Sequence, residues 1–479
     1  MEAYKQNDEA GERLVRQDFE HVRTHALALR SEPLEKRKKR LKALLRWILS
    51  NRQRIKASIF ADFNKPAAEV DISEIYPAVA EIRHALRHID RWARPVKVDA
   101  PLNYLGTWSE VRYEPRGVCL ILSPWNFPFN LSVGPLVSCL AAGNAAILKP
   151  SEHTPHTASL LKAMAEEVFQ HGEVKVIEGG AQTASLLLGL PFDHIFFTGS
   201  PAIGKVVMKA AAAHLTSVTL ELGGKSPAIV DQSADLAEAA RRIVFGKFLN
   251  NGQTCIAPDY LLVHQAVMSP LVDELKKQVA RMFGAEKQID EQAVSYGRIV
   301  NAHHFQRLTR LLEEATAGGA KIELGGPRHV ESRFFHPFIL SHVPAEARIM
   351  DEEIFGPILP LIPFEQAQQV VQYINSKPKP LALYVFARKK SFSEHILRET
   401  SSGTVCINDC VLQFTHINLP FGGVNNSGIG KTHGHYGFLA FSNEKPVLRQ
   451  KGGFTLSSLF YPPFTQAMRR RIEPILRWF

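Results

Sequence analysis

The sequence predicts an α/β protein in which a doubly wound domain with a parallel sheet is followed by a second α/β domain. From residue 112 onward, short apolar runs alternate with helix-like segments, and this alternation is typical of βαβ units. Several of the runs end in glycine-containing turns that lead into the next helix. The chain has 479 residues, of which 45% are hydrophobic and 22% charged, so it can bury more than one core.

The N-terminal region is expected to begin with a polar segment and to continue as one amphipathic helix over residues 34–60. Apolar residues recur there at three- and four-residue spacing, with Lys and Arg on the opposite side. A basic face of this kind could bind anions. A solvated helix face has the same pattern, and it is the simpler interpretation because runs of charge usually only contact water.

The alternation places the expected elements in order along the chain. In the first half, strands are expected at residues 118–122, 145–148, 175–177, 194–198, 218–221 and 228–230, with a helix at 157–170. In the second half, helices are expected at 236–250 and 268–282, and strands at 260–263, 338–340, 383–386 and 404–407. No internal repeat or long Gly/Ser linker separates the halves, so the domains should be interleaved or tightly packed.

Residues 117–148 contain no charged residue, which raises the alternative of a membrane span. A spanning helix needs about 20 mostly apolar residues in a row. Pro124, Pro128 and Pro135 interrupt this segment together with several Asn residues, and they would leave backbone and amide groups unsatisfied in lipid. A buried strand, loop and helix of a soluble core is therefore expected.

The formal net charge of +10 would suit a nucleic acid or an anionic membrane as partner. The excess is localised, however. Ten Lys and Arg lie between Lys36 and Lys56 with no acid among them, and four Arg lie between Arg469 and Phe479 with Glu473 as the only acid. Without these two stretches the chain carries a net charge of −3, so no nucleic-acid partner is expected.

The five cysteines are an odd number in a long chain, without the dense pairing of a secreted disulfide scaffold. The first ten residues are polar and acidic and lack the apolar stretch of a secretory signal. Both observations favour a reducing cytosol.

Glycine-rich turns at strand ends indicate phosphate binding. Gly199, Ser200 and Gly204 follow an expected strand and begin a helical pattern, where backbone N–H groups and the helix dipole can hold a phosphate. By itself this turn is a weak signal. A second turn, at residues 222–227, directly follows Glu221.

Two polar loops contain candidate catalytic groups. Cys255 lies in a glycine-containing loop, an unusual place for a core cysteine, so it is a candidate nucleophile as well as a candidate loop residue. Cys119 and Cys139 lie in apolar runs and are expected to pack in the core. Asn126 lies in an aromatic and proline loop, where its amide could stabilise an oxyanion or simply form a turn.

No metal site is predicted. Cys406 and Cys410 have no second pair of ligands nearby in the sequence, and His433 and His435 lack further ligands. A Walker A loop, a Gly-x-Ser-x-Gly elbow and the dinucleotide fingerprint Gly-x-Gly-x-x-Gly are also missing.

A series of blocks, in the same order along the chain, resembles the NAD(P)-dependent aldehyde dehydrogenase superfamily. They are residues 124–128 (Pro-Trp-Asn-Phe-Pro), 149–152, 197–200 with Gly204, 221–225 (Glu-Leu-Gly-Gly-Lys), 252–255 (Gly-Gln-Thr-Cys), 352–357 and 419–423. The resemblance covers about residues 10–450. Residues 255–260 and 380–385 resemble class 3, the branch that includes the fatty aldehyde dehydrogenases.

The resemblance implies that Cys255 is the nucleophile, that Glu221 is the general base and that the Asn126 amide holds the oxyanion. In that reaction the Cys255 thiolate attacks the aldehyde carbonyl, and the thiohemiacetal loses hydride to the nicotinamide ring. Glu221 then activates the water that hydrolyses the thioester to a carboxylic acid. Because Glu221 and Cys255 are 34 residues apart, only folding could bring them together.

The resemblance also implies which residues bind NAD. Lys149, Glu152 and Glu353 would bind ribose hydroxyls, Leu122, Pro124, Trp125 and Phe355 would pack on the rings, and Gly199, Ser200 and Gly204 would lie beside the adenine and pyrophosphate. A carboxylate such as Glu152 accepts a hydrogen bond from a free 2′-hydroxyl and repels a 2′-phosphate, which favours NAD. The nearby Lys149 leaves NADP open.

The implied architecture is the aldehyde dehydrogenase fold. It would comprise a doubly wound NAD-binding domain at residues 1–96 and 117–220, an α/β catalytic domain at 221–430, a small β oligomerisation segment at 97–116 and 431–450, and a C-terminal tail at 451–479. The oligomerisation segment implies a homodimer.

Two alternative functions compete with this reaction. A CoA-acylating relative would transfer the acyl group to CoA, but such relatives typically lack the base that Glu221 supplies here. A non-catalytic protein with the same fold is opposed by the presence of Cys255, Glu221 and Asn126.

The substrate and the tail are less determined by the sequence. Apolar residues suggest a hydrophobic aldehyde, either aliphatic of medium or long chain or aromatic; they are Phe414, Ile417, Leu419, Leu459 and Phe464. The tail mixes further apolar residues with Arg469–Arg471, so it could touch an anionic bilayer, cover an apolar pocket or pack on a subunit. The expected location is the cytoplasm, with peripheral membrane contact as one alternative.

Overall fold

The structure is a computed structural model of the 479-residue chain. It describes residues 2–101, 104, 106–169, 172–284, 295–450, 452 and 461–478, and for residues 2–10, 471, 475, 476 and 478 only the backbone is described.

The first large sheet has the strand order β17-β7-β6-β3-β4-β5, in which β17 is antiparallel to β7 and the other neighbours are parallel. Its strands are β3 (Val118–Leu122), β4 (Ala145–Lys149), β5 (Val174–Val176), β6 (His194–Gly199), β7 (Ser217–Leu222) and β17 (Gly428–Ile429). Alternate residues of these strands enter two different cores, so the sheet is buried on both faces.

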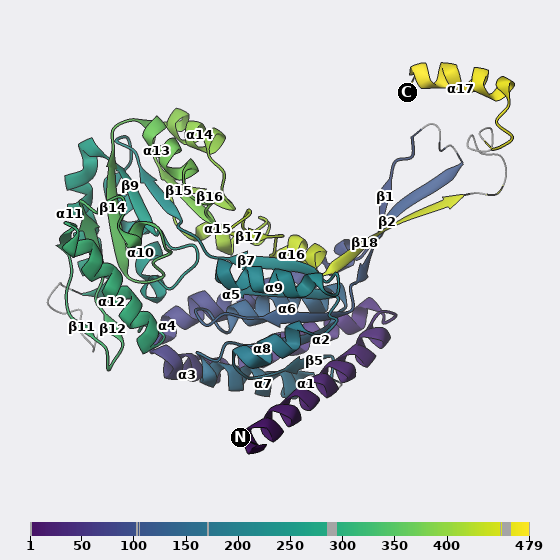
Figure 1. The fold of residues 1–479 in the computed structure, drawn as a ribbon, viewed down its shortest axis with the longest axis horizontal. Coiled ribbons are helices and arrows are strands. Elements are labelled where there is room, and N and C mark those ends of the chain that lie inside the picture. Colours follow the sequence, from purple (N-terminus) through teal and green to yellow (C-terminus); the bar gives the residue numbers. More distant parts are fainter. Residues whose placement is uncertain are drawn as a thin grey trace.

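Helices cover both faces of this sheet, as the doubly wound prediction requires (Figure 1). One face carries α2 (Leu34–Ser50), α3 (Arg52–Phe63), α5 (Tyr76–Trp92), α6 (Asn130–Ala142), α7 (Pro155–Val168) and α16 (Gly434–Ala440). The other carries α1 (Glu2–Leu29), α8 (Ala181–Leu188) and α9 (Pro201–Ala212). Between α3 and α5 lie the short α4 (Ala67–Val70) and a π-helical turn, Asp71–Ile75.

The second large sheet has the order β10-β13-β14-β9-β8-β15-β16, parallel except for β10. Its strands are β8 (Pro227–Val230), β9 (Tyr260–His264), β10 (Lys321–Leu324), β13 (Phe338–Ser341), β14 (Ile358–Phe364), β15 (Ala382–Phe386) and β16 (Thr404–Ile407). Helices α10 (Leu236–Phe248) and α11 (Met268–Phe283) pack on one face, and α12 (Ala302–Ala317), α13 (Ala367–Asn375) and α14 (Lys390–Glu399) pack on the other. The expected strand at 228–230, grouped with the first half, therefore belongs to this second sheet.

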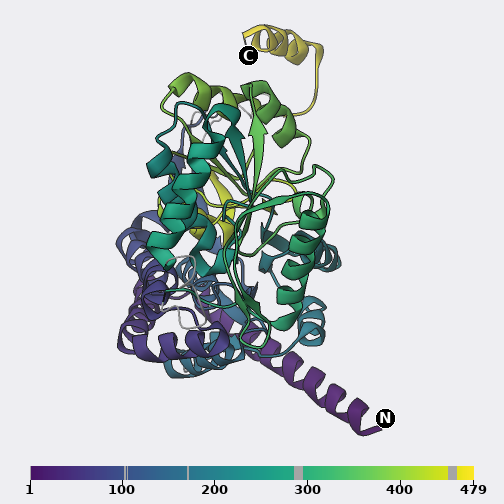
Figure 2. The same ribbon diagram turned by 90° about the vertical axis from the view of Figure 1, so that its left-hand side faces the viewer.

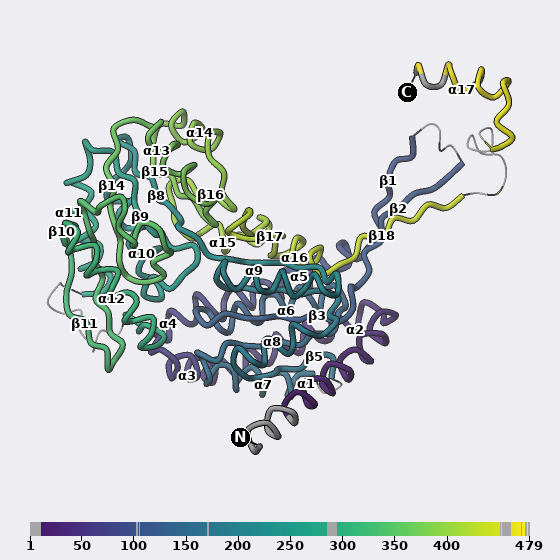
Figure 3. The backbone as a smooth tube through the Cα atoms, viewed as in Figure 1, coloured from purple at the N-terminus to yellow at the C-terminus, as the bar shows by residue number. Residues whose placement is uncertain are grey.

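A third sheet of three antiparallel strands extends away from both larger sheets as an arm (Figure 1). It consists of β1 (Val96–Val98), β2 (Thr107–Pro115) and β18 (Ser442–Gln450), and the tube view shows β2 and β18 running side by side along it (Figure 3). Helix α17 (Gln466–Trp478) lies beyond the outer end of the arm and stands clear of the body in a second view (Figure 2). The small elements β11 (Arg328–His329), β12 (Phe334–Phe335) and α15 (Leu412–Thr415) complete the main elements.

One N-terminal prediction was wrong, and one N-terminal helix had not been predicted. The polar segment before residue 34 forms the long helix α1, which buries Phe19 and Val22 against the first sheet. The single helix expected over 34–60 is two helices, because Asn51 leaves the helical conformation and its backbone N–H turns back to the carbonyls of Trp47 and Ile48. Both helices keep an apolar face, so the periodicity continues across the break.

The basic stretch 36–56 is largely paired with acids from other segments. Arg40 binds Glu32 at 2.6 Å and the buried Glu173 at 3.0 Å. Further ion pairs join Lys36 to Glu32, Lys38 to Glu35 and Asp90, Arg52 and Lys56 to Asp71, and Arg54 to Glu167. The basic face is therefore more than a solvated surface, although each exposed pair contributes little to stability.

The uncharged segment 117–148 forms β3, α6 and β4, nearly all of it buried in the core of the first sheet. Among the described helices, none combines the length and the apolar character that crossing a bilayer would demand. The domain limits expected from the resemblance stay a prediction; β7 runs two residues past the expected boundary at 220, to Leu222, and β17 returns to the same sheet at 428–429.

Candidate functional site

One pocket brings together residues that the sequence places far apart. Cys255 and Glu221 both line it, with Phe414 and Ile417 from the loop around α15. Its walls come from α5, α6, β6, β7 and the loops at 414–421 and 432–433. Leu419 and Phe464, which were expected to contact substrate, are exposed and are not among its lining residues, and Leu459 lies outside the described residues.

The loop that carries Cys255 has an uncommon backbone. After α10 ends at Phe248, Asn250, Asn251 and Gly252 have φ angles of 51°, 55° and 71°, in the left-handed region. Asn is the non-glycine residue that tolerates this region best, because its short side chain can bond locally. A side chain at Gly252 would collide with the Gly356 carbonyl, so the loop packs directly on residues 352–357.

Glu221 is a buried carboxylate without a neutralising partner. It lies on β7 with 6% of its surface exposed, and neither side-chain oxygen accepts a hydrogen bond from any described residue. Burial raises its pKa well above the usual range, and Lys431 opposes this only in part, since the Lys431 ammonium donates to the carbonyls of Gly422 and Gly423 instead. An unsatisfied buried carboxylate is free to take a proton.

Cys255 is partly exposed to the pocket, in contrast to the fully buried Cys119 and Cys139. Burial of the sulfur is the main reason that the pKa of its thiol is raised, and the negative charges of Glu353 and Glu221 add to the effect. Backbone N–H groups of Cys255 and Ile256 work in the opposite direction. The five cysteines are all free, as the sequence suggested.

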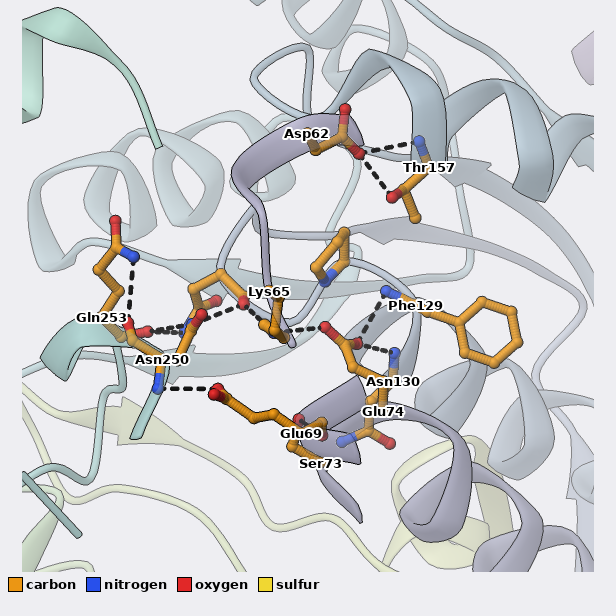
Figure 4. A network of polar contacts seen from close by, with 12 residues as sticks. Asp62, Lys65, Glu69, Ser73, Glu74, Phe129, Asn130, Thr157, Asn250 and Gln253 are labelled. Atoms are coloured by element: carbon orange, nitrogen blue, oxygen red, sulfur yellow. Dashed lines mark hydrogen bonds and ion pairs between the residues drawn. The ribbon is translucent and has the colours of Figure 1, made fainter. Parts of the chain in front are cut away.

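Asn126 is held beside the Cys255 loop rather than on the pocket wall. It is buried, and its Nδ2 donates to the carbonyl of Gln253 at 3.0 Å, two residues before Cys255. The backbone carbonyl of Asn126 accepts hydrogen bonds from Asn250 Nδ2 at 2.8 Å and from Lys65 Nζ at 3.1 Å. These bonds fix the two loops against each other (Figure 4).

A buried ion pair that the sequence did not reveal supports Asn126. Lys65 Nζ lies 2.7 Å from Glu74 Oε1, and both side chains are fully buried. The other oxygen of Glu74 accepts the backbone N–H groups of Phe129 and Asn130, at the start of α6 (Figure 4). A lysine and a glutamate nine residues apart carry no signal of burial in the sequence, so only the structure identifies them.

A second ion pair connects three of the motif blocks. Lys225 Nζ binds Asp259 Oδ2 at 2.6 Å and also donates to the carbonyls of Ile349 and Glu352. Asp259 in turn accepts the backbone N–H of Ile354. The carboxylate of the adjacent Glu353 lies against Gly223, so a side chain at Gly223 would displace it, and burial raises the pKa of that carboxyl to about 8.

The residues expected to bind the cofactor lie at one edge of the first sheet. Leu122, Lys149 and Gly199 end the parallel strands β3, β4 and β6, and Pro124 and Trp125 follow β3. Ligands of doubly wound sheets bind outside the carboxyl ends of the strands. The indole of Trp125 contacts the ring of Phe355 edge to face, with centroids 5.2 Å apart.

Local geometry at this edge suits a dinucleotide. Ser200 is the N-cap of α9; its hydroxyl accepts the N–H of Ile203 and Pro201 carries none, so only part of the first turn of the helix remains for an anion. A Cβ at Gly204 would lie 2.7 Å from Leu222 Cδ2, so only glycine lets α9 approach β7 this closely. Lys149 Nζ donates to Glu152 Oε2 at 3.0 Å, which brings both ribose candidates together. Among the described residues, no group of three or more His, Cys, Asp or Glu could hold a metal ion.

Replacing Lys65 by Met should leave Glu74 as an unpaired buried charge and lower the free energy of unfolding by about 3–5 kcal/mol. The double variant Lys65→Met/Glu74→Gln should be less destabilised than Lys65→Met alone, because the charge is gone. Urea unfolding followed by circular dichroism measures both. Lys162→Met, which removes the half-exposed pair with Glu178, is the matched control and should change stability by about 0.5 kcal/mol or less. A Lys65→Met protein as stable as that control would contradict this account.

Alkylation of Cys255 by iodoacetamide should be slow at neutral pH and should accelerate as the pH rises, because the thiol pKa is raised above its ordinary 9.0. Glu353→Gln removes a negative neighbour, so it should lower the thiol pKa and speed alkylation at a given alkaline pH. Peptide mapping by mass spectrometry distinguishes Cys255 from Cys406. The exposed Glu365→Gln is the control; equal rates in both variants would exclude the electrostatic coupling.

Comparison with known proteins agrees with this geometry. The aldehyde dehydrogenase family model matches residues 2–447. A putative aldehyde dehydrogenase of Bacillus subtilis (strain 168), AldX, is 42% identical over 443 residues, covering 92% of this chain and 99% of that protein. Aldehyde dehydrogenase family 3 member A2 of Macaca fascicularis is 40% identical over 461 residues, covering 95% of this chain and 92% of that protein.

A solved structure agrees as well. The substrate-bound state of Staphylococcus aureus AldH has a TM-score of 0.92 at 38% sequence identity, and the match covers 96% of this chain and 99% of that one. These similarities confirm the superfamily, its class 3 character and the fold expected from the motif blocks. The chain belongs to the aldehyde dehydrogenase family, and it is an oxidoreductase that acts on aldehydes with NAD or NADP.

Proposed function

We propose that this enzyme oxidises a hydrophobic aldehyde to the carboxylic acid through a thiohemiacetal and a thioester at Cys255. The observation that supports this most directly is the pocket that Cys255 shares with the unpartnered carboxylate of Glu221. NAD or NADP, when bound, supplies the hydride acceptor. The residues of the chain itself carry out the attack on the aldehyde, the stabilisation of the oxyanion and the hydrolysis.

Cys255 attacks the aldehyde carbon after losing its proton. The raised pKa of the thiol means that it needs a base, and Glu221 lines the same pocket with both oxygens free of hydrogen bonds. The same carboxylate can later take a proton from the water that hydrolyses the thioester. Its raised pKa makes this carboxylate a stronger base than an exposed glutamate.

The oxyanion of the thiohemiacetal would be held by the Asn126 amide. In the structure one Nδ2 hydrogen is engaged by the Gln253 carbonyl at 3.0 Å, which leaves the second for the substrate oxygen. Lys65 and Asn250 hold the backbone carbonyl of Asn126, and Gln253 holds its side-chain amide, so the amide is positioned in advance, as electrostatic stabilisation of this kind requires.

NAD is the proposed preferred cofactor. Glu152 is exposed, and although desolvation raises its pKa, hydrogen bonds from its own N–H and from Lys149 hold that pKa below the usual range. It is therefore ionised at neutral pH, accepts a hydrogen bond from a free 2′-hydroxyl and repels a 2′-phosphate. Lys149 is the residue through which NADP could still be accommodated.

The hydrophobic substrate class follows from the pocket lining. Phe414, Ile417, Leu131 and Phe421 contribute apolar surface near Cys255. Pockets of this kind discriminate only weakly among chain lengths, at about 1 kcal/mol per methylene. The proposal therefore covers aliphatic and aromatic aldehydes.

Cys255→Ala should abolish aldehyde-dependent NADH formation while leaving NAD binding intact. Glu221→Gln should lower both the first release of NADH and the steady turnover at least ~100-fold, because the same base serves the attack by Cys255 and the hydrolysis, and general-base catalysis contributes about 10²–10⁴-fold. Stopped-flow absorbance, with the acid product measured by mass spectrometry in the absence of CoA, records both.

Cys406→Ala is the matched control, because this partly exposed thiol on β16 is not among the pocket-lining residues, and it should retain activity. Steady turnover by Cys255→Ala would refute the assigned nucleophile. An acyl group released only when CoA is added would favour the CoA-acylating alternative.

A homodimer formed through the arm is also part of the proposal. The arm exposes Val96, Val98 and Leu448, and its outer strands β1 and β18 have no further strand paired to them within the described chain. Exposed strand edges and apolar side chains are typical of a surface that a second copy covers.

The tail, with exposed Phe464, Arg469 and Arg470, is the proposed site of peripheral contact between a cytosolic enzyme and an anionic membrane.

A variant that ends at Lys451 separates these two roles. It should stay dimeric by light scattering, because β18 remains, and it should lose sedimentation with vesicles that contain phosphatidylserine. Vesicles of phosphatidylcholine alone are the control. Monomers would place the dimer contact in the tail, and unchanged vesicle binding would exclude the tail as the membrane contact.

A further inference from the structure

The apolar pocket contains two polar side chains that the proposed reaction does not use and that packing leaves at least partly free. Glu81 on α5 and Asn130 at the start of α6 both line it. Glu81 is 9% exposed and Asn130 is 6% exposed, so both are taken out of bulk water. Buried polar groups normally have hydrogen-bond partners, and an exception calls for an explanation.

Only one of the two Glu81 oxygens is engaged. Oε1 accepts the backbone N–H of Gly434 at 2.6 Å, which ties α5 to the start of α16. Oε2 forms no hydrogen bond with any residue that the structure describes. Burial raises the pKa of this carboxyl to about 7, and the Gly434 N–H opposes the rise.

Asn130 is in a similar position. Its backbone N–H donates to Glu74, but within the described chain its side-chain amide makes no hydrogen bond. The pocket wall formed by α5 and α6 thus offers one carboxylate oxygen as acceptor and one amide as donor and acceptor.

The surroundings of Glu81 and Asn130 make these side chains selective for one kind of polar group on the substrate. His433 beside them is neutral, since burial lowers its pKa to about 4, and its ring stacks on Phe421 with centroids 5.3 Å apart. Leu131 and Pro135 supply further apolar surface.

We propose that Glu81 and Asn130 bind a hydroxyl group carried by an otherwise apolar aldehyde, at the pocket wall formed by α5 and α6. The hydroxyl donates to Glu81 Oε2 and accepts from the Asn130 amide. This inference rests on the proposed function for the reaction at Cys255 and adds the class of substrate.

Other polar ends fit less well. A carboxylate would be repelled by Glu81, and an ammonium group would bring three donors to a site with a single free carboxylate oxygen. A methyl end would leave both polar groups unpaired in a desolvated pocket, which discriminates strongly against substrates that lack the matching group.

The test compares two probes that differ by one methyl group, para-hydroxymethyl and para-methoxymethyl benzaldehyde, and the two cinnamaldehydes with the same substituents, which are longer. An alcohol of this type does not ionise near neutral pH, unlike a phenol. The wild-type enzyme should prefer the hydroxymethyl compound by about tenfold or more in kcat/KM in at least one of the two series, as hydrogen bonds to a charged group generally allow.

Glu81→Gln should reverse this preference. The amide oxygen replaces Oε1 as acceptor for the Gly434 N–H, so the NH₂ group takes the place of Oε2 and can only donate, which suits an ether oxygen. The ratio of kcat/KM values for hydroxymethyl over methoxymethyl should fall by about tenfold or more. Asn130→Ala, which keeps the backbone bond to Glu74, is a second variant and should lower the same ratio.

Glu173→Gln is the matched control, because it neutralises a buried carboxylate that lies outside the pocket, and it should leave the ratio unchanged. A wild-type enzyme without preference in both series, or a ratio that neither Glu81→Gln nor Asn130→Ala alters, would overturn the inference while the proposed function stands. If the wild-type enzyme oxidises none of the probes or their unsubstituted parents, the proposed function fails first, and the inference fails with it.

Discussion

The buried ion pair between Lys65 and Glu74 is the interaction on which the site depends. Both charges are fully enclosed, and each is matched by further hydrogen bonds: the ammonium by the Asn126 carbonyl, the carboxylate by the N–H groups of Phe129 and Asn130. Burying two charges is costly, and the cost is offset only where geometry and hydrogen bonds are as complete as they are here. Removing either partner would weaken the contacts that hold the Asn126 loop and the start of α6. It would also affect the Cys255 loop, which is bonded to Asn126 through Asn250.

The pair from Lys225 to Asp259 has the same role on the other side of the site. It joins the end of β7, the segment before β9 and the loop at 349–354, each from a different part of the chain. The two pairs together bring the carboxyl ends of strands of the first sheet and the amino ends of β8, β9 and β14 of the second sheet to one place. Polar networks of this kind specify a single arrangement because any other packing would leave a buried charge unsatisfied.

Contacts between segments explain part of the net charge of +10, and the proposed role of the tail explains another part. Acids on α5, α7 and other segments lie against the basic stretch on α2 and α3, with Asp71, Asp90, Glu167 and Glu173 as partners. A run of Lys and Arg without acids in its own sequence is therefore an inter-element contact surface. The basic residues of α17 differ, since that helix lies beyond the arm and away from the body (Figure 2).

The alternation of strands and helices, the motif blocks and the family could be predicted from the sequence, because periodicity and glycine turns depend on residues that are neighbours in the chain. The break at Asn51 could not be predicted, since the apolar periodicity continues across it. The helix before residue 34 could not be predicted either, because it is polar over much of its length. Leu419 is apolar but exposed, whereas Glu81 and Asn130 are polar and line the pocket. The sequence by itself determined which reactive groups are available, namely a thiol, carboxylates and amides, and it determined a parallel sheet of the kind that binds dinucleotides. Only the tertiary structure decided which of these are buried, paired or left free, because burial and charge at each atom are set by segments that lie far away in the chain.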